Sequence, residues 1–246
     1  MKSKLNILLS LLFAVTSVAA DKKPAHLFIL SGQSNMQGMD PKTGFVPECD
    51  KLFPDATVDF IKIARGGQPI RLWVEEWNTI AKKHDIDTRI ESTRYYQPIL
   101  EQFGQLLTKH PNPTSVTFCW MQGERDAKTN LDAAYPDALR QLVANLRRDL
   151  KQPDMNIVIA RICDHLGPEN KSWQAVRKAH VDVATSDPHG AWVDCDDLND
   201  KNDKNGNPRN DLHYTKPGYE LLGRRFARQA KALITGNQPS KNGRPE

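Results

Sequence analysis

The stretch from His26 to Asp40, HLFILSGQSNMQGMD, decides the fold because an apolar run ends in it abruptly at a polar turn. Residues 26–30 have the length and composition of a buried strand, and the glycine at position 32 marks the turn that follows. Ser34 therefore stands at a strand-to-turn junction. A serine hydroxyl is essentially un-ionised at neutral pH, so as a nucleophile it needs a histidine base that a third group orients. Ser34 is the first candidate nucleophile.

An acid and a histidine follow near the other end of the chain, where Asp211 and His213 stand two residues apart. Taken singly, Ser34 is typical of a polar turn and His213 of a solvated loop. A serine early in the chain and an Asp/His pair late in it together indicate a hydrolytic triad.

Strands and helices alternate along the chain. Strand-like runs occur at residues 26–30, 57–64, 115–121, 156–162 and 191–194. Helical spacing of apolar residues occurs at residues 97–109, 131–151, 171–185 and 217–234. This alternation predicts an α/β domain with a mostly parallel sheet that helices cover on both faces.

The polar motifs follow the ends of the predicted strands. Ser34 comes after the first strand, Arg65-Gly66-Gly67 after the second, and Gln122-Gly123-Glu124 after the third, while Asp211 and His213 lie in the long loop after the last. Ligands of open α/β sheets bind beyond the carboxyl ends of the strands. We therefore expect all four motifs at one edge of the sheet.

The N-terminus reads as an export signal. Residues 1–20 contain Lys2 and Lys4, an apolar stretch too short for an ordinary membrane span, and small residues that end at Ala20. We predict a signal peptide over residues 1–20, one α/β domain over residues 21–236 that carries the candidate triad, and a flexible polar tail over residues 237–246. The expected location is secreted or periplasmic, with no membrane attachment after cleavage.

Charge and composition exclude several classes of protein. The net charge of +4 comes from 34 basic and 30 acidic residues spread along the chain, which predicts no nucleic-acid partner. No nucleotide-binding glycine motif occurs, and no His/Cys/carboxylate cluster has the spacing of metal ligands, so we expect no cofactor and no metal. The Asp/Asn-rich stretch 194–210 does not fit the EF-hand template, which favours a solvated loop over a calcium site. Of the four cysteines, Cys163 and Cys195 are the most plausible disulfide pair.

Four motifs together resemble those of a known superfamily. They are Gly32-Gln33-Ser34-Asn35-Met36, Gly66-Gly67, the segment Trp120 to Asp126 (WMQGERD) and Asp211-Leu212-His213. This set resembles the SGNH hydrolases, specifically the sialate O-acetylesterase and acetylxylan esterase-like branch, and the resemblance covers nearly the whole chain after residue 20. It implies a three-layer α/β/α sandwich with a mostly parallel five-stranded sheet, which is a flavodoxin-like arrangement. Met36 in place of a second glycine argues against the nucleophile elbow of the α/β-hydrolases.

The resemblance also implies roles for particular residues. The oxyanion donors would be the backbone N–H groups of Ser34 and Gly67 and the side-chain amide of Gln122. The acid that orients His213 stays open between two residues. The common pattern places an Asp three residues before the histidine, where this chain has Asn210, so Asp211 and Glu124 are equal candidates.

Two residues are candidates for binding the substrate: Arg65 through an oxygen, and Trp73 as a surface on which a sugar stacks. The sequence thus predicts a serine esterase that removes O-acetyl groups from carbohydrates, either an acetylated polysaccharide or sialic acid. Two alternatives remain: a catalytically silent carbohydrate-binding module on the same fold, and a lipase or thioesterase of broader acyl specificity. The sequence does not determine the oligomeric state.

Overall fold

The computed structural model describes residues 23–87 and 93–244, so the predicted signal peptide lies outside the described residues. The strands of the main sheet are β1 (Ala25–Gly32), β2 (Thr57–Ala64), β3 (Ser115–Met121), β4 (Asn156–Ala160) and β5 (Gly190–Val193). The longer helices are α2 (Phe45–Leu52), α4 (Tyr96–Lys109), α6 (Tyr135–Asp149), α7 (Lys171–Ser186) and α8 (Lys216–Ile234). Shorter elements are α1 (Ser34–Gly38), η1 (Ile70–Leu72), α3 (Trp77–Lys83), α5 (Glu124–Lys128) and the hairpin strands β6 (Asp200–Asn202) and β7 (Pro208–Asn210).

The main sheet is parallel, with the strand order β2-β1-β3-β4-β5. Strand β1 lies between β2 and β3, and all but its first residue are buried, which explains why it reads as a continuous apolar run. The order is that of flavodoxin-like folds, in which ligands bind where the strand order reverses. The predicted five-stranded α/β sandwich is therefore confirmed.

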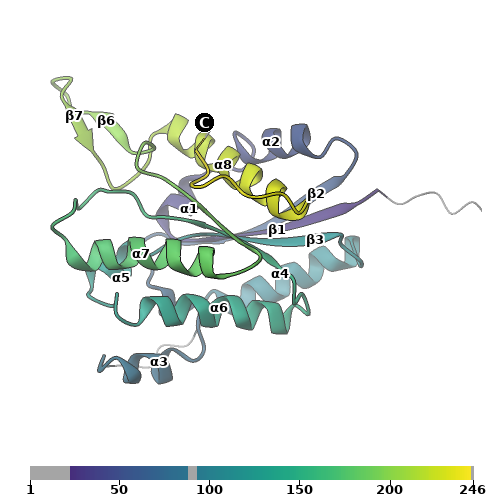
Figure 1. Ribbon diagram of the computed structural model, residues 1–246, viewed down its shortest axis with the longest axis horizontal. Helices are drawn as coiled ribbons and strands as arrows, with labels where there is room; N and C mark the ends of the chain where they lie inside the picture. Colours follow the sequence, from purple (N-terminus) through teal and green to yellow (C-terminus); the bar gives the residue numbers. More distant parts are fainter. Residues whose placement is uncertain (1–22, 88–92, 245–246) are drawn as a thin grey trace, which may run out of the picture.

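Helices cover both faces of the sheet (Figure 1). Helices α2 and α8 pack against each other on one face, and α4, α6 and α7 lie on the other. Helix α6 buries Leu139, Leu142 and Leu146, which recur at the spacing of one helix face. The amphipathic pattern thus determines which side of each helix meets the sheet.

The carboxyl ends of the strands meet at one edge, at the left of Figure 1, where α1 and the hairpin β6–β7 also lie. The hairpin forms within the Asp/Asn-rich stretch that was predicted to be a solvated loop. The carboxylate of Asp203 accepts hydrogen bonds from the backbone N–H groups of Asn205 and Asn207, at 2.8 and 2.9 Å, and so closes the turn.

Residues of the segment that was predicted as a flexible tail make contacts with the domain. The side chain of Gln229 donates to the carbonyl of Ser240 at 2.9 Å, and the backbone N–H of Asp194 donates to the carbonyl of Asn242 at 2.7 Å. Arg244 pairs with Asp194 at 3.1 Å. The amide of Gln229 also donates to the carbonyl of Trp192 at 2.7 Å, which gives the edge strand β5 a partner.

The cysteines do not form the predicted bridge. Cys49, Cys119, Cys163 and Cys195 are all free and buried. Burial raises the pKa of each thiol above its ordinary value, so each behaves as a small apolar residue of the core.

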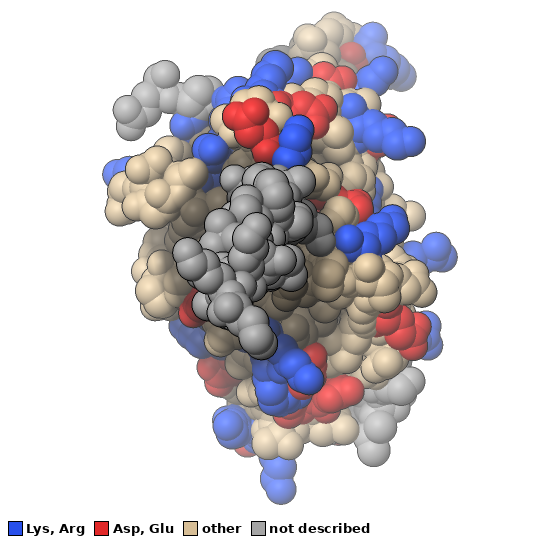
Figure 2. Space-filling view, turned by 90° about the vertical axis from the view of Figure 1, so that its right-hand side faces the viewer, with Lys and Arg blue, Asp and Glu red and all other residues tan. Residues whose placement is uncertain are grey.

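Acidic and basic side chains are interspersed on the face at which the strands begin (Figure 2). No helix within residues 23–87 and 93–244 has the length and apolar content that crossing a membrane requires.

Gly32 allows the ends of β1 and β3 to close together. Its φ is +148°, and a Cβ at this position would lie 1.9 Å from the backbone oxygen of Met121. We expect Gly32→Ala to lower the free energy of unfolding by roughly 3 kcal/mol or more, because neither backbone can move without breaking the sheet. Denaturant unfolding measures the loss.

The control is Gly104→Ala on α4, where a Cβ meets no atom within 4 Å. The higher helix propensity of alanine should raise the free energy of unfolding of this variant by up to about 1 kcal/mol. Equal stabilities of the two variants would contradict this account.

Candidate active site

Four segments that are distant in sequence enclose one cavity at the carboxyl edge of the sheet. They are the start of α1 after β1, the Gly66-Gly67 turn after β2, helix α5 after β3 and the loop before α8. The cavity has a volume of about 380 Å³ and is lined by Gln33, Ser34, Gly66, Gly67, Glu124, Arg125, Lys128, Leu212 and His213. Three parallel strands thus bring their terminal motifs to one place, with the final loop beside them.

Ser34 is the first residue of α1 and faces His213. The backbone N–H of Gln33 bonds to the carbonyl of Met121 at 2.9 Å, which ties the start of this helix to the end of β3. The Oγ of Ser34 lies 3.1 Å from the Nε2 of His213. This is the separation that a nucleophilic hydroxyl and its general base require.

The side chain of His213 is poised as a base. Partial burial lowers the pKa of His213, and this effect outweighs the nearby Asp211 carboxylate, which raises it. Lys201, Lys128 and His165 add further lowering effects. A lowered pKa keeps the imidazole neutral, and thus able to accept a proton, at neutral pH.

Asp211 contacts His213 through the main chain. One carboxylate oxygen, Oδ1, accepts from the backbone N–H of His213 at 3.2 Å. The other, Oδ2, lies 3.3 Å from the Nζ of Lys201 and 3.8 Å from a guanidinium nitrogen of Arg209. The charge of Asp211 therefore acts on the imidazole while its oxygens are held by other groups.

Glu124 is the first residue of α5 and is almost fully buried at the base of the cavity. Its Oε1 accepts from the side-chain amide of Asn35 at 2.9 Å. Its Oε2 is buried and has no hydrogen-bond partner within the described part of the chain. Burial raises the pKa of Glu124 to about 7, against lowering effects from its own backbone N–H, Asn35 and Lys128. Near neutral pH this carboxyl is therefore only partly ionised.

Asn35 joins the two ends of the site, a role that the sequence reasoning missed. Its Nδ2 donates to Glu124 and also to the carbonyl of Leu212 at 3.1 Å. Its Oδ1 accepts from the backbone N–H of Tyr214 at 3.3 Å and from the hydroxyl of Tyr219 at 3.2 Å. Because Leu212 and Tyr214 flank the histidine, Asn35 holds the His213 loop against α1. The only sequence signal for this role is its position directly after Ser34.

The predicted oxyanion donors separate into two groups. The backbone N–H of Ser34 lies at the start of a helix, and Gly67 lines the cavity with φ of +70°, a conformation that favours glycine. The side chain of Gln37 holds this turn in place by accepting from the backbone N–H of Gly66 at 2.7 Å. Both predicted backbone donors thus belong to segments that border the cavity.

Gln122 lies elsewhere than the prediction placed it, because its side chain is fully buried beneath the cavity. Its amide nitrogen donates to Asp126, to the carbonyl of Gln68 at 3.0 Å and to Gln33 at 3.3 Å. An amide with these acceptors has no N–H to spare for an oxyanion. Asp126 in turn accepts from the backbone N–H of Ile70 at 3.0 Å, so this network fixes the chain after the Gly66-Gly67 turn.

The two predicted substrate contacts do not line the cavity. Arg65 is exposed, and its backbone N–H bonds to the carbonyl of Gly32 at 3.1 Å. Trp73 belongs to the core: its side chain is fully buried, its Nε1 donates to the Oγ of Ser31 at 3.0 Å, and it packs against Trp120. The prediction that Trp73 stacks on a sugar is therefore wrong, because the chain turns inward after the glycine pair.

Two cations on α5 line the cavity, where Arg65 was predicted to contact the substrate. Arg125 and Lys128 are exposed, stand three residues apart and both line the cavity. Side chains at this spacing lie on the same face of a helix. Together they make this wall of the cavity positively charged.

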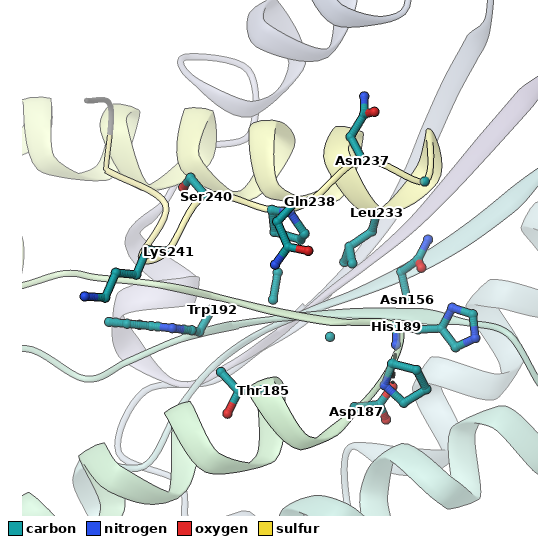
Figure 3. A pocket seen from close by; sticks show the side chains of 15 residues that line it. Asn156, Thr185, Asp187, His189, Trp192, Leu233, Asn237, Gln238, Ser240 and Lys241 are labelled. Atoms are coloured by element: carbon teal, nitrogen blue, oxygen red, sulfur yellow. Dashed lines mark hydrogen bonds between the residues drawn. The ribbon is translucent and has the colours of Figure 1, made fainter.

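A second, larger cavity lies near the other edge of the sheet, between the start of β5 and the C-terminal residues (Figure 3). Its volume is about 670 Å³, and Asn156, Trp192 and Gln238 are among its lining residues. Its acid, Asp187, is paired with Arg147 at 2.7 Å. Ser34 and His213, which face each other, line the smaller cavity, so that cavity is the candidate active site. Among residues 23–87 and 93–244, no group of three or more His, Cys, Asp or Glu residues could hold a metal ion.

Comparisons with known proteins identify the family of the chain. The model of a family described as "Carbohydrate esterase, sialic acid-specific acetylesterase" matches residues 37–232. This range contains Glu124, Asp211 and His213 and starts just after Ser34. A protein of Escherichia coli (strain K12) named "Probable 9-O-acetyl-N-acetylneuraminic acid deacetylase" is 36% identical over 110 residues, which are 42% of this chain and 33% of that protein. The match thus spans only about a third of the length of that relative.

Two solved structures share the fold. One is a protein from Arabidopsis thaliana, with a TM-score of 0.60 and 19% identity over 87% of this chain and 100% of that one. The other is a carbohydrate acetylesterase from Xanthomonas citri, with a TM-score of 0.59 and 15% identity over 86% of this chain and 56% of that one. At these identities the likeness concerns the fold alone.

Proposed function

Because the chain belongs to the carbohydrate esterase family of sialic acid-specific acetylesterases, we propose that it hydrolyses O-acetyl esters of carbohydrates with Ser34 as the nucleophile. One observation carries the proposal: the Oγ of Ser34 and the Nε2 of His213 lie 3.1 Å apart in a cavity that is open to substrate. The direct test is the release of acetate from O-acetyl sialic acid and from acetylated xylan. Release from neither substrate would contradict the proposal.

The reaction proceeds in two steps. The Oγ of Ser34 attacks the acetyl carbonyl carbon while the Nε2 of His213 accepts the hydroxyl proton. The tetrahedral oxyanion receives hydrogen bonds from the backbone N–H groups of Ser34 and Gly67. It collapses as His213 returns the proton to the leaving sugar oxygen, which gives an acetyl-enzyme and a free hydroxyl group. Water, deprotonated by His213, then attacks the acetyl carbonyl carbon. The bond to the Oγ of Ser34 breaks, His213 returns the proton to that oxygen, and acetate is released.

We assign the charge that steadies protonated His213 to Asp211. The support is electrostatic: among the charges near His213, that of Asp211 favours the imidazolium. Against the raising effect of burial, the pKa of Asp211 is kept low by the hydrogen bond from the backbone N–H of His213 and then by Lys201 and Arg209. Glu124 is less suited because burial raises its pKa to about 7. In this assignment Glu124 holds Asn35, which in turn holds the His213 loop.

The charge of the cavity wall favours an acidic sugar. Arg125 and Lys128 can pair with a carboxylate on a substrate whose acetyl group lies at Ser34. We expect Arg125→Gln to raise KM for O-acetyl sialic acid by about tenfold, because the substitution removes one exposed charged hydrogen bond. KM for acetylated xylan should stay within about twofold of the wild-type value. Steady-state kinetics on the two substrates measure the split.

The matched control for this split is Arg140→Gln, which removes an exposed arginine from α6 instead. An equal rise in KM for the acidic and the neutral substrate would contradict selection by charge. Selective loss with the acidic substrate in both variants would point to the net charge of the protein rather than to the cavity wall.

We also propose that the protein is exported to the periplasm or the medium. The support is the sequence of residues 1–20, in which basic residues, an apolar stretch and small residues follow one another. Acetylated polysaccharides outside the cytoplasm would then be within reach.

A further inference from the structure

The hairpin β6–β7 places two cations beside the histidine loop. Lys201 on β6 and Arg209 on β7 are directly opposite each other in the antiparallel register. Both reach the same carboxylate oxygen, Oδ2 of Asp211, at 3.3 and 3.8 Å. Cross-strand neighbours of like charge repel each other, so their shared contact with one anion is what makes the arrangement favourable.

Asp211 connects this cation pair to the base of the reaction. Its second oxygen accepts from the backbone N–H of His213 at 3.2 Å. The main chain of Asp211 is also held, because its carbonyl accepts from the side chain of the buried Asn199 at 2.7 Å. The carboxylate is therefore fixed on one side by the hairpin and on the other by the histidine loop.

The charged groups around His213 come from several elements. Asp211 and Lys201 act from the loop and the hairpin, Lys128 from α5 and His165 from the loop after β4. Arg125 and Glu124 line the same cavity, and Arg209 contacts Asp211. Among these groups, only Lys201 lies within hydrogen-bond distance of the Asp211 carboxylate through a side-chain cation, in the part of the chain that the structure describes.

We propose that Lys201 is a positioning residue of the esterase reaction: its ammonium group holds the Asp211 carboxylate and partly neutralises it, so the hairpin sets the lower pH limit of catalysis. The inference rests on the proposed function, since it requires His213 to be the base. Its physical basis is competition for one anion. The positive charge of Lys201 offsets part of the negative charge of Asp211, so Asp211 stabilises the protonated imidazole less. The pKa of His213 is then lower, and His213 acts as a base down to a lower pH.

The test is the pH dependence of kcat/KM for p-nitrophenyl acetate in Lys201→Gln, with Lys204→Gln as the matched control in the turn of the same hairpin. Loss of Lys201 should raise the pKa of His213, so the midpoint of the acid limb moves to higher pH by roughly half a unit. Lys201→Arg, which keeps the charge, should restore the wild-type profile. The shift should shrink in high salt, because salt screens exposed charges.

A second arm tests whether Lys201 acts through Asp211. In an Asp211→Asn background the shift that Lys201→Gln causes should be clearly smaller than in the wild type. A shift of equal size in both backgrounds would overturn the role of Lys201 through Asp211. The same role would be overturned if Lys201→Gln and Lys204→Gln had the same pH dependence of kcat/KM. These results would leave the proposed function intact if wild-type protein still releases acetate and Ser34→Ala does not. An inactive wild type would overturn the proposed function and this inference together.

Discussion

Ser34→Ala is expected to lower kcat for p-nitrophenyl acetate by about a thousandfold or more. The substitution removes the attacking oxygen, and neither the oxyanion donors nor His213 can replace it. The fold should be unaffected, because among the described residues the Oγ of Ser34 has a hydrogen bond only with the exposed side chain of His213. The thermal midpoint should therefore stay within about 2 °C of the wild-type value.

A second serine gives the control for this experiment. Ser172 lies at the start of α7, and its hydroxyl donates to the side chain of Asn130. The variant Ser172→Ala should keep full activity. A fluorophosphonate probe should label the wild type and Ser172→Ala but not Ser34→Ala. If wild type and Ser34→Ala hydrolyse the ester at the same rate, Ser34 is not the nucleophile, and a silent carbohydrate-binding module becomes the better interpretation.

Asp211→Asn should lower kcat by about a hundredfold or more, whereas Glu124→Gln should change it by no more than about fivefold. Both substitutions keep an oxygen acceptor, for the backbone N–H of His213 and for the amide of Asn35 respectively. Each thus removes a charge with little change of geometry. Because the charge of Asp211 raises the pKa of His213, its loss should also move the acid limb of kcat/KM to lower pH.

The activities of Asp211→Asn and Glu124→Gln decide which of the two acids orients His213, a choice that the sequence left open. A large loss in Glu124→Gln together with near-normal activity of Asp211→Asn would reverse the assignment and make Glu124 the partner of His213. Thermal unfolding of both variants is the control, because a variant that unfolds at the assay temperature would lose activity for another reason.

Much of the fold could be predicted because its signals are local and strong. All five predicted strands and all four predicted long helices are present, with boundaries that differ by a few residues. The prediction missed α2, which has eight residues, and several shorter elements. Helices α1 and α5 have five residues each, too few for a periodic pattern to be visible.

The candidate site was predictable as a set of segments but not as a set of contacts. The rule that parallel strands present their carboxyl ends at one edge correctly placed Ser34, Gly67 and Glu124 around one cavity. It could not tell that Trp73 turns into the core, nor that the amide of Gln122 is occupied by Asp126. Both outcomes depend on how loops from different strands pack, and residue spacing holds no information on that.

The sequence by itself determined the parallel α/β architecture, the family and the two segments that bring Ser34 and His213 to one cavity, because periodicity and short motifs are properties of neighbouring residues. Only the tertiary structure decided which groups surround that pair. Asn35 bonds to Leu212, which is 177 positions away in the chain, and Lys201 reaches Asp211 from the hairpin. Hydrogen bonds and charges act over a few ångströms in space, so the environment of His213 became defined only when the chain had folded.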